Sequence, residues 1–117
     1  MNVTRFASAP EYFPPRHDGM RCVRLQGHEA GPTDTVWIGV SQIEPGGGTS
    51  LDASPVEKLY VVLEGTVTLV NDVAEVQLSR YDSCRLAPGE PRRLVNGTDR
   101  PASILLVMPY AARSESN

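Results

Sequence analysis

Hydrophobic residues in this chain recur in short runs, which glycine, proline and other turn-forming residues separate every few positions. The runs rich in β-branched and apolar residues, each of strand length, are 20–25, 35–43, 58–63, 66–70, 73–78, 84–86, 93–96 and 102–108. Ten glycines and ten prolines spread over the chain argue against long helices. Short strands with turn signals at this spacing predict an all-β sandwich or barrel.

The turn signals also divide the chain. Prolines at 10, 14 and 15 predict an extended N-terminal arm over residues 1–19. The barrel is expected over 20–110, with a sharp break at the Pro-Gly-Gly-Gly stretch 45–48 and a hairpin turn at 71–72. The polar end, 111–117, is expected to be a flexible tail. A length of 117 residues fits one domain.

Composition and charge exclude several classes of function. Hydrophobic residues make up 40% and charged residues 21%, as in ordinary globular proteins. A net charge of −3 provides no basic surface for nucleic acid or for anionic membranes. The longest apolar runs are far too short to span a bilayer, and the N-terminus has no signal-peptide pattern. Two cysteines, Cys22 and Cys84, are too few for a disulfide scaffold, so a reduced, cytoplasmic location is expected.

The most specific pattern is a pair of glycines that frames the chain's single lysine. Gly46 is followed after five residues by Asp-Ala-Ser at 52–54, after three more by Lys58, and after six more by Gly65. The first motif of the cupin family has the same frame: Gly, five residues, His-x-His, three or four residues, Glu, six residues, Gly. On this frame the chain resembles the cupins, which are double-stranded β-helix, or jelly-roll, barrels.

A second set of residues follows the cupin family's second motif. Tyr81 stands in place of its first glycine, and Ala-Pro-Gly at 87–89, Arg92 and Asn96 follow at the family's distances. The 15 residues between the motifs, 66–80, match the short spacers of bacterial cupins. The resemblance covers residues 35–109 and implies an all-β, single-domain, double-stranded β-helix (jelly-roll, cupin) barrel. It also implies a homodimer.

The resemblance locates a pocket and changes its expected chemistry. In metal-bearing cupins two histidines, a glutamate and a later histidine converge on one divalent ion. Here those positions hold Asp52, Ser54, Lys58 and Arg92. Protonated lysine and arginine repel a cation, whereas a first-row metal site needs about three protein donors. We therefore expect no metal and no other cofactor.

Two points bear on that expectation. The only histidines, His17 and His28, lie in predicted loops outside the motifs, where a solvated side chain is the usual outcome. A slip of one residue in the strand would point Glu57 inward in place of Lys58. The spacing to the following apolar residues favours Lys58.

The pocket residues suggest the handling of an anion. Lys58 and Arg92 would attract a carboxylate, enolate or phosphate group. Asp52 is a candidate general base, and Tyr60 a donor to a developing oxyanion. Alternatively, burial beside Arg92 would lower the pKa of Lys58 and make it a base or a Schiff-base nucleophile. Two further residues are expected to contact the substrate, namely Ser54 and Trp37.

These features predict a metal-independent isomerase- or lyase-type protein that acts on a small carboxylate-bearing metabolite. One alternative is a non-catalytic barrel that binds or senses a small molecule, and another is a metallocupin with displaced ligands. In a purely structural interpretation, Asp52 and Lys58 neutralise each other and Arg92 points to solvent. The expected partners are a small anionic ligand and a second copy of the chain.

Overall fold

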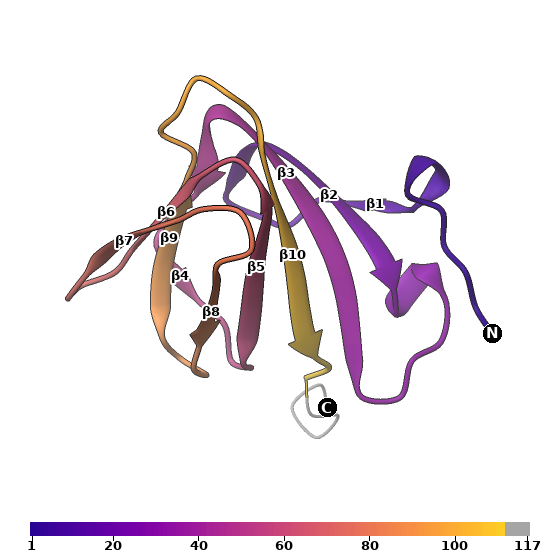
Figure 1. Cartoon of the computed structure of the whole chain (residues 1–117). Helices are drawn as coiled ribbons and strands as arrows, with labels where there is room; N and C mark the ends of the chain where they lie inside the picture. The colour runs from indigo at the N-terminus through magenta and orange to yellow at the C-terminus, as the bar shows by residue number, and fades with distance from the viewer. Residues whose placement is uncertain (112–117) are drawn as a thin grey trace.

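Strands make up nearly all the regular structure of residues 1–111, the part of the chain that this computed structural model describes (Figure 1). In chain order the elements are η1 (Phe6–Ser8), β1 (Glu11–Tyr12), β2 (His17–Gln26), η2 (His28–Ala30), β3 (Val36–Thr49), β4 (Asp52–Ala53), β5 (Lys58–Glu64), β6 (Val67–Val70), β7 (Glu75–Leu78), β8 (Ser83–Leu86), β9 (Pro91–Val95) and β10 (Ala102–Pro109). The two η elements are single 3₁₀ turns. The predicted all-β class is confirmed, and no helix among these residues is long and apolar enough to cross a membrane.

The strands form one curled antiparallel sheet in the order β7-β6-β9-β3-β10-β5-β8. β2 pairs with both β1 and β3, and β4 pairs with β9. Strands β7 and β8 lie at the two ends of this order, so the barrel is nearly closed but has an unpaired seam between them. Figure 1 shows the β6–β7 hairpin projecting from the barrel beside that seam.

The predicted chain break at 45–48 was wrong, because β3 runs on through these residues to Thr49. The glycines allow one strand to pass close to two neighbours. A Cβ atom on Gly48 would lie 2.1 Å from the backbone oxygen of Leu94, and one on Gly47 would lie 2.5 Å from that of Gly19. At Gly48 β3 is thus paired with Asp18 of β2 and with Val95 of β9.

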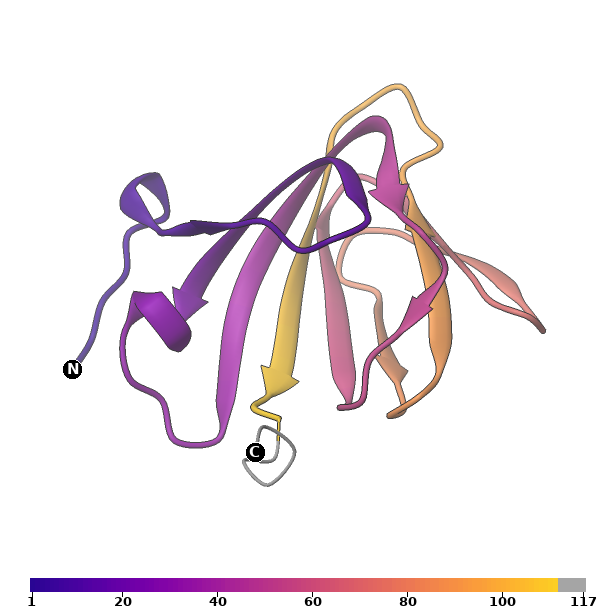
Figure 2. The same ribbon diagram turned by 180° about the vertical axis from the view of Figure 1, so that it is seen from behind.

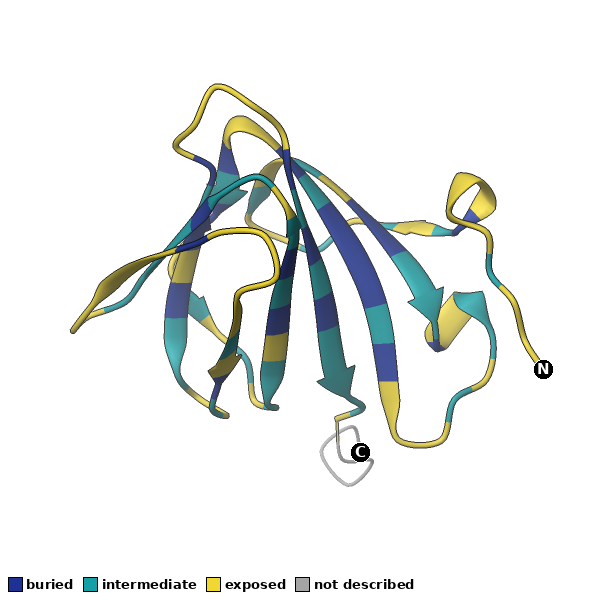
Figure 3. Ribbon diagram, viewed as in Figure 1, coloured by how far each residue is buried: buried dark blue, intermediate teal, exposed yellow. Residues whose placement is uncertain are grey.

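The alternation along β5 sets which side chains face the barrel interior. Tyr60 and Val62 are buried, whereas Leu59 is exposed and Val61 and Leu63 are only partly buried (Figure 3). Lys58 shares the inward parity of Tyr60 and Val62, so the register predicted for Lys58 is the one found. The main core consists of such inward residues, including Ile43, Val62, Leu94 and Ile104.

The N-terminal segment passes around the edge of the sheet. Ala9 packs on the outer face against Val23 and Val40, and Tyr12 then pairs with Cys22 in β2. Figure 2 shows the following segment crossing in front of β3 and β10 before the chain enters β2. Strand β2 begins at His17, so residues 17–19 belong to the sheet and not to the arm as predicted. The predicted tail lies outside the described residues, except for Ala111.

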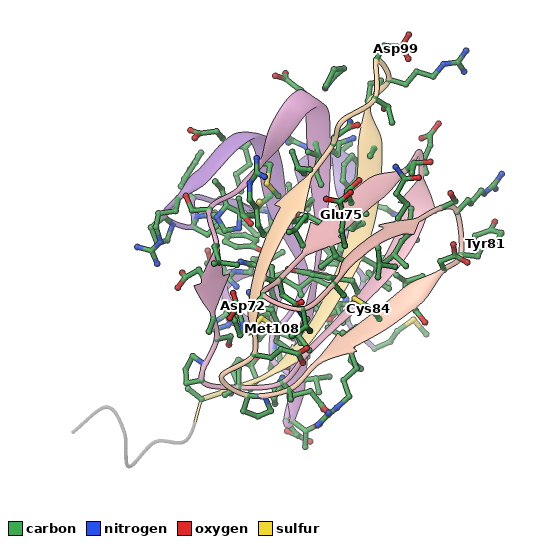
Figure 4. All side chains as sticks on the ribbon, turned by 90° about the vertical axis from the view of Figure 1, so that its left-hand side faces the viewer. Asp72, Glu75, Tyr81, Cys84, Asp99 and Met108 are labelled. Atoms are coloured by element: carbon green, nitrogen blue, oxygen red, sulfur yellow. The ribbon has the colours of Figure 1, made fainter. Side chains whose placement is uncertain are left out.

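In the turn between β7 and β8, Tyr81 occupies the position where the cupin family's second motif has a glycine. Tyr81 adopts the left-handed conformation, with φ of 72°, and its side chain projects into solvent at the end of the loop before β8 (Figure 4). Its backbone N–H donates to the carbonyl oxygen of Val62 at 2.7 Å. The turn thus retains its geometry at the cost of backbone strain.

Candidate anion site

A cavity of about 120 Å³ opens between the N-terminal segment and the inner face of the barrel. Its polar walls come from β2, β3, β5 and β9, and its floor is apolar. Lining side chains belong to Tyr12, Pro14, His17, Met20, Trp37, Ser41, Lys58, Tyr60, Arg92, Leu94, Ile104, Leu106 and Met108. The cavity therefore contains four of the six residues predicted to form the site: Trp37, Lys58, Tyr60 and Arg92.

Arg92 is the most deeply buried charge of this site, with only 4% of its surface exposed. Its Nε donates a hydrogen bond to the Tyr60 hydroxyl at 2.9 Å. The ion pairs among residues 1–111 join other groups, and none includes Arg92. The neighbouring Arg93 is exposed, so strand alternation sends one arginine inward and the other outward. Arg92 is thus a buried cation without a carboxylate partner in the described chain.

Lys58 supplies a second positive charge in the same cavity. Burial, with the nearby Arg92 guanidinium as the next cause, lowers the pKa of Lys58 from near 10.5 to about 8. Asp52 opposes this shift but lies beyond ion-pair distance from Lys58. Most Lys58 side chains are therefore still charged at pH 7, and they are poised to lose the charge in mildly alkaline solution.

The aromatic residues have distinct places. The Tyr60 hydroxyl accepts its hydrogen bond from Arg92, which leaves its own proton available to a ligand. Burial raises the pKa of Tyr60, so that proton stays in place at neutral pH. Trp37 packs edge-on against Tyr12, with ring centroids 5.7 Å apart, and the Arg24 guanidinium lies 4.4 Å from the Trp37 centroid. Trp37 thus forms a rigid wall.

The other two predicted site residues lie outside the cavity lining. Asp52 stands opposite Arg92 in the β4–β9 pair, but its carboxylate binds Arg16 at 2.5 Å and is half exposed. That hydrogen bond holds the pKa of Asp52 below its usual range. The Ser54 hydroxyl accepts from the backbone N–H of Val56. Glu57 forms an ion pair with Arg85. The predicted Asp52–Lys58 neutralisation is not among the ion pairs.

The prediction that His17 lies in a loop outside the site was wrong. His17 begins β2, where it pairs with Thr49 of β3, and its ring lines the cavity. The ring Nδ1 lies 2.7 Å from the carbonyl oxygen of Pro15. Burial, opposed by that hydrogen bond and assisted by Arg92, Lys58 and Arg16, lowers the pKa of His17. The run of prolines before it was the available signal, because it shows that this segment is extended enough to cross the barrel.

A second cavity, of about 160 Å³, lies on the seam side of the barrel and shares Arg92 with the first. Its walls are mainly apolar and come from the β6–β7 hairpin and from β8. Cys84 lines it, and burial raises the pKa of that thiol, which keeps it protonated. Figure 4 shows Cys84 in the barrel wall, away from the exposed Tyr81. Cys84 is partly buried and packs against the main core.

The side chains at the four motif positions do not fit a divalent metal ion. Two are cations, the Asp52 carboxylate is bound to Arg16, and the Ser54 hydroxyl is bound to the chain. Residues 1–111 contain no group of three or more His, Cys, Asp or Glu side chains placed to hold a metal. His17 is a single good donor beside two positive charges, and a first-row metal needs about three.

Comparison with known proteins identifies the family. The family model for the cupin domain matches residues 39–108, more than half of the chain. This chain is a cupin. A Mycobacterium tuberculosis protein named beta-D-galactosidase is 41% identical over 110 residues, which cover 94% of this cupin and 95% of that protein.

Solved structures agree with this assignment. The polyketide cyclase RemF from Streptomyces resistomycificus has a TM-score of 0.82 at 19% identity, over 93% of this cupin and 79% of the cyclase. A cupin-superfamily sugar phosphate isomerase from Silicibacter pomeroyi has a TM-score of 0.77 at 26% identity, over 92% and 74%. The cyclase shows the fold alone. Together with the family match, these structures confirm the predicted jelly-roll cupin barrel.

Proposed function

We propose that this cupin binds a small anionic metabolite and, without a metal ion, catalyses isomerase- or lyase-type chemistry next to a carbonyl group. The observation that carries the proposal is Arg92, a residue with 4% of its surface exposed and no carboxylate partner in residues 1–111. Lys58 adds a second charge in the same cavity. A carboxylate or phosphate is the ligand that two such cations accommodate best.

The energetics support a ligand over a structural remnant. Removing an ion from water costs several kcal/mol in a protein unless a partner compensates. Among the described residues, 1–111, the one hydrogen-bond acceptor of Arg92 is the Tyr60 hydroxyl, which binds Nε. A planar carboxylate would accept hydrogen bonds from the remaining guanidinium nitrogens in a bidentate geometry.

The rest of the cavity suits a polarised carbonyl compound. The Tyr60 hydroxyl accepts from Arg92 Nε, and its own proton points to no acceptor among the described residues. A hydroxyl held there stabilises negative charge that develops on a carbonyl oxygen. The sugar phosphate isomerase among the similar structures carries a name consistent with this class of chemistry. Substrates that combine an anionic group with a nearby carbonyl are therefore our candidates, including sugar-derived acids and phosphates.

Glycoside hydrolysis is the second candidate, because the 41% identical relative is named a beta-D-galactosidase. Most glycosidases use two carboxyl groups on either side of the scissile bond. Among residues 1–111 no Asp or Glu lines the cavity, and the carboxylate predicted for the site, Asp52, is bound to Arg16. The side chains therefore favour the anion proposal. The test is an assay with nitrophenyl β-D-galactoside. If the wild-type protein hydrolyses this compound and Asp52→Asn does not, the glycosidase function is favoured over the anion proposal.

Calorimetric titration tests the anion proposal directly. Pyruvate and its neutral amide, pyruvamide, have nearly the same shape, so their difference in affinity reports the charge. We expect the wild-type protein to bind pyruvate at least tenfold more tightly, and Arg92→Leu to remove that preference. Arg93→Leu is the matched control, since it removes the adjacent but exposed arginine. Equal affinity for both compounds, or an unchanged preference in Arg92→Leu, would contradict the proposal. Anion binding with no turnover would favour the sensing alternative.

A further inference from the structure

His17 faces the proposed anion site from the N-terminal side of the cavity. It lies at the start of β2, while the two cations come from β5 and β9, and all three side chains line the cavity. The prolines before it and the left-handed turn at Arg16, with φ of 58°, aim the chain back into the sheet at this point. The backbone oxygen of Arg16 accepts from Ser50 N–H, which fixes the turn against β3.

The hydrogen bond to Pro15 defines the chemical state of the ring. A carbonyl oxygen can only accept, so Nδ1 must carry the proton at the 2.7 Å contact. In the neutral ring Nε2 then holds an unshared electron pair and is the basic nitrogen. The positive groups facing the ring, Arg16, Lys58 and Arg92, all oppose its protonation, as does its burial. The ring is thus a neutral base of fixed tautomer in a positively charged cavity.

Other titratable groups of the cavity are poorly suited to remove a proton. Lys58 is mainly protonated at neutral pH and holds the anion. Burial raises the pKa values of Tyr12 and Tyr60, so both retain their protons. Asp52 is bound to Arg16 outside the lining. His17 is therefore the residue with a free electron pair at neutral pH.

We infer that His17 is the catalytic base of this cupin and removes a proton from the carbon next to the carbonyl group of the bound anion. The inference rests on the proposed function. The C–H bond breaks, its electron pair forms a carbon–carbon double bond, and the carbonyl π pair moves to the oxygen. The Tyr60 hydroxyl donates to that oxygen, and the proton resides on His17 Nε2.

The same base completes the reaction. Return of a proton to the original carbon gives exchange with solvent. Return to the neighbouring carbon of an enediol gives an isomer, with the hydroxyl oxygen losing a proton and the former carbonyl oxygen gaining one. No oxidant, reductant or co-reactant is needed, so the step balances with the groups of the cavity and water.

Deuterium exchange tests this role without knowledge of the natural substrate. Pyruvate and dihydroxyacetone phosphate each have an anionic group and an exchangeable C–H bond beside a carbonyl. Proton NMR in D₂O would follow loss of those C–H signals with wild-type protein, His17→Gln and His28→Gln. His28 is the chain's other histidine, and its ring packs on Trp37 and Tyr110 outside the cavity lining.

We expect catalysed exchange in wild-type protein and in His28→Gln, and a reduction of roughly 10²–10⁴-fold in His17→Gln. Affinity of His17→Gln for the same probe, measured by calorimetry, should stay within about threefold, because general-base loss affects the proton transfer and not the anion contact. A direct check of the tautomer is the ¹⁵N spectrum, which should show Nδ1 of His17 protonated at pH 7.

The outcomes separate the two ideas. If wild-type protein binds neither probe, the proposed function fails. If it binds a probe without accelerating exchange, or if His17→Gln exchanges at the wild-type rate, the assignment of His17 is overturned while anion binding stands. A His17→Gln protein that loses probe binding together with exchange also overturns the assignment, because His17 then acts in binding.

Discussion

Removing the charge of Arg92 together with its hydrogen-bond partner Tyr60 should make the unliganded protein more stable. The double variant Arg92→Leu/Tyr60→Phe replaces an arginine with 4% of its surface exposed and the hydroxyl that its Nε binds at 2.9 Å. The lost hydrogen bond, which has a charged donor, contributes about 1.5–3 kcal/mol. The relieved desolvation amounts to several kcal/mol, and apolar replacements of buried charges have stabilised other proteins by about 1–4 kcal/mol.

We therefore expect a net gain of about 1–3 kcal/mol in the free energy of unfolding. Urea denaturation at a fixed protein concentration measures it. With an m value of about 2 kcal/mol/M, a gain of 2 kcal/mol moves the midpoint up by about 1 M. The single variant Tyr60→Phe should instead be destabilised, because Arg92 then has no protein acceptor in the described chain.

Two controls make the interpretation strict. Arg93→Leu alters an exposed side chain and should change stability by less than about 0.5 kcal/mol. Saturating pyruvate should raise the midpoint of the wild-type protein but not that of the double variant. A double variant with a midpoint at or below that of the unliganded wild type would refute the claim that Arg92 is an uncompensated buried charge.

Four further outcomes follow from the structure. Affinity for pyruvate should fall between pH 7 and 9, because Lys58, with a pKa of about 8, loses its charge over this range. The free energy of unfolding should rise over pH 8 to 10.5, because in that range the unfolded chain keeps the lysine proton and the folded chain does not. The variant Lys58→Met should remove both pH dependences. Asn96→Ala should lose about 2–4 kcal/mol by urea denaturation, because its buried amide donates to two backbone oxygens and accepts from Thr98. Tyr81→Gly should gain about 0.5–1 kcal/mol in the same assay by relieving the left-handed backbone. We expect the chain to form a homodimer through the apolar outer face of β5. The variant Leu59→Arg should then have the mass of a monomer in light scattering. An unchanged dimer mass would exclude this face as the interface.

Local patterns were enough to predict the barrel and part of the site. Alternation of Tyr60 and Val62 in β5 indicated that Lys58 points inward, and the structure places it there. The motif spacing likewise located Arg92, whose burial depends on its parity in β9. Both features arise from the two-residue period of a strand, which a sequence displays directly.

Contacts between distant segments were not predictable in the same way. His17 lies far from the motifs in sequence, and it reaches the cavity only because the N-terminal segment crosses the barrel. Arg16 arrives by the same route and binds Asp52, which the motif alone placed in the site. Taken alone, the glycines at 46–48 predicted an end to the strand. Their use as a close crossing point depends on β9, which comes more than 40 residues later.

The seam between β7 and β8 gives the barrel a region that opens more easily than the rest. β7 has hydrogen-bonded partners along one side only, in β6, whereas β3 and β10 are each held on both sides. Amide protons of the β6–β7 hairpin should therefore exchange with solvent through local opening, long before those of β3. Because Arg92 lines both the seam cavity and the first cavity, we expect each such opening to bring water to the buried Arg92 side chain from the seam side. For the anion that we propose at Arg92, we therefore expect the rate of dissociation to depend on local opening of the β6–β7 hairpin.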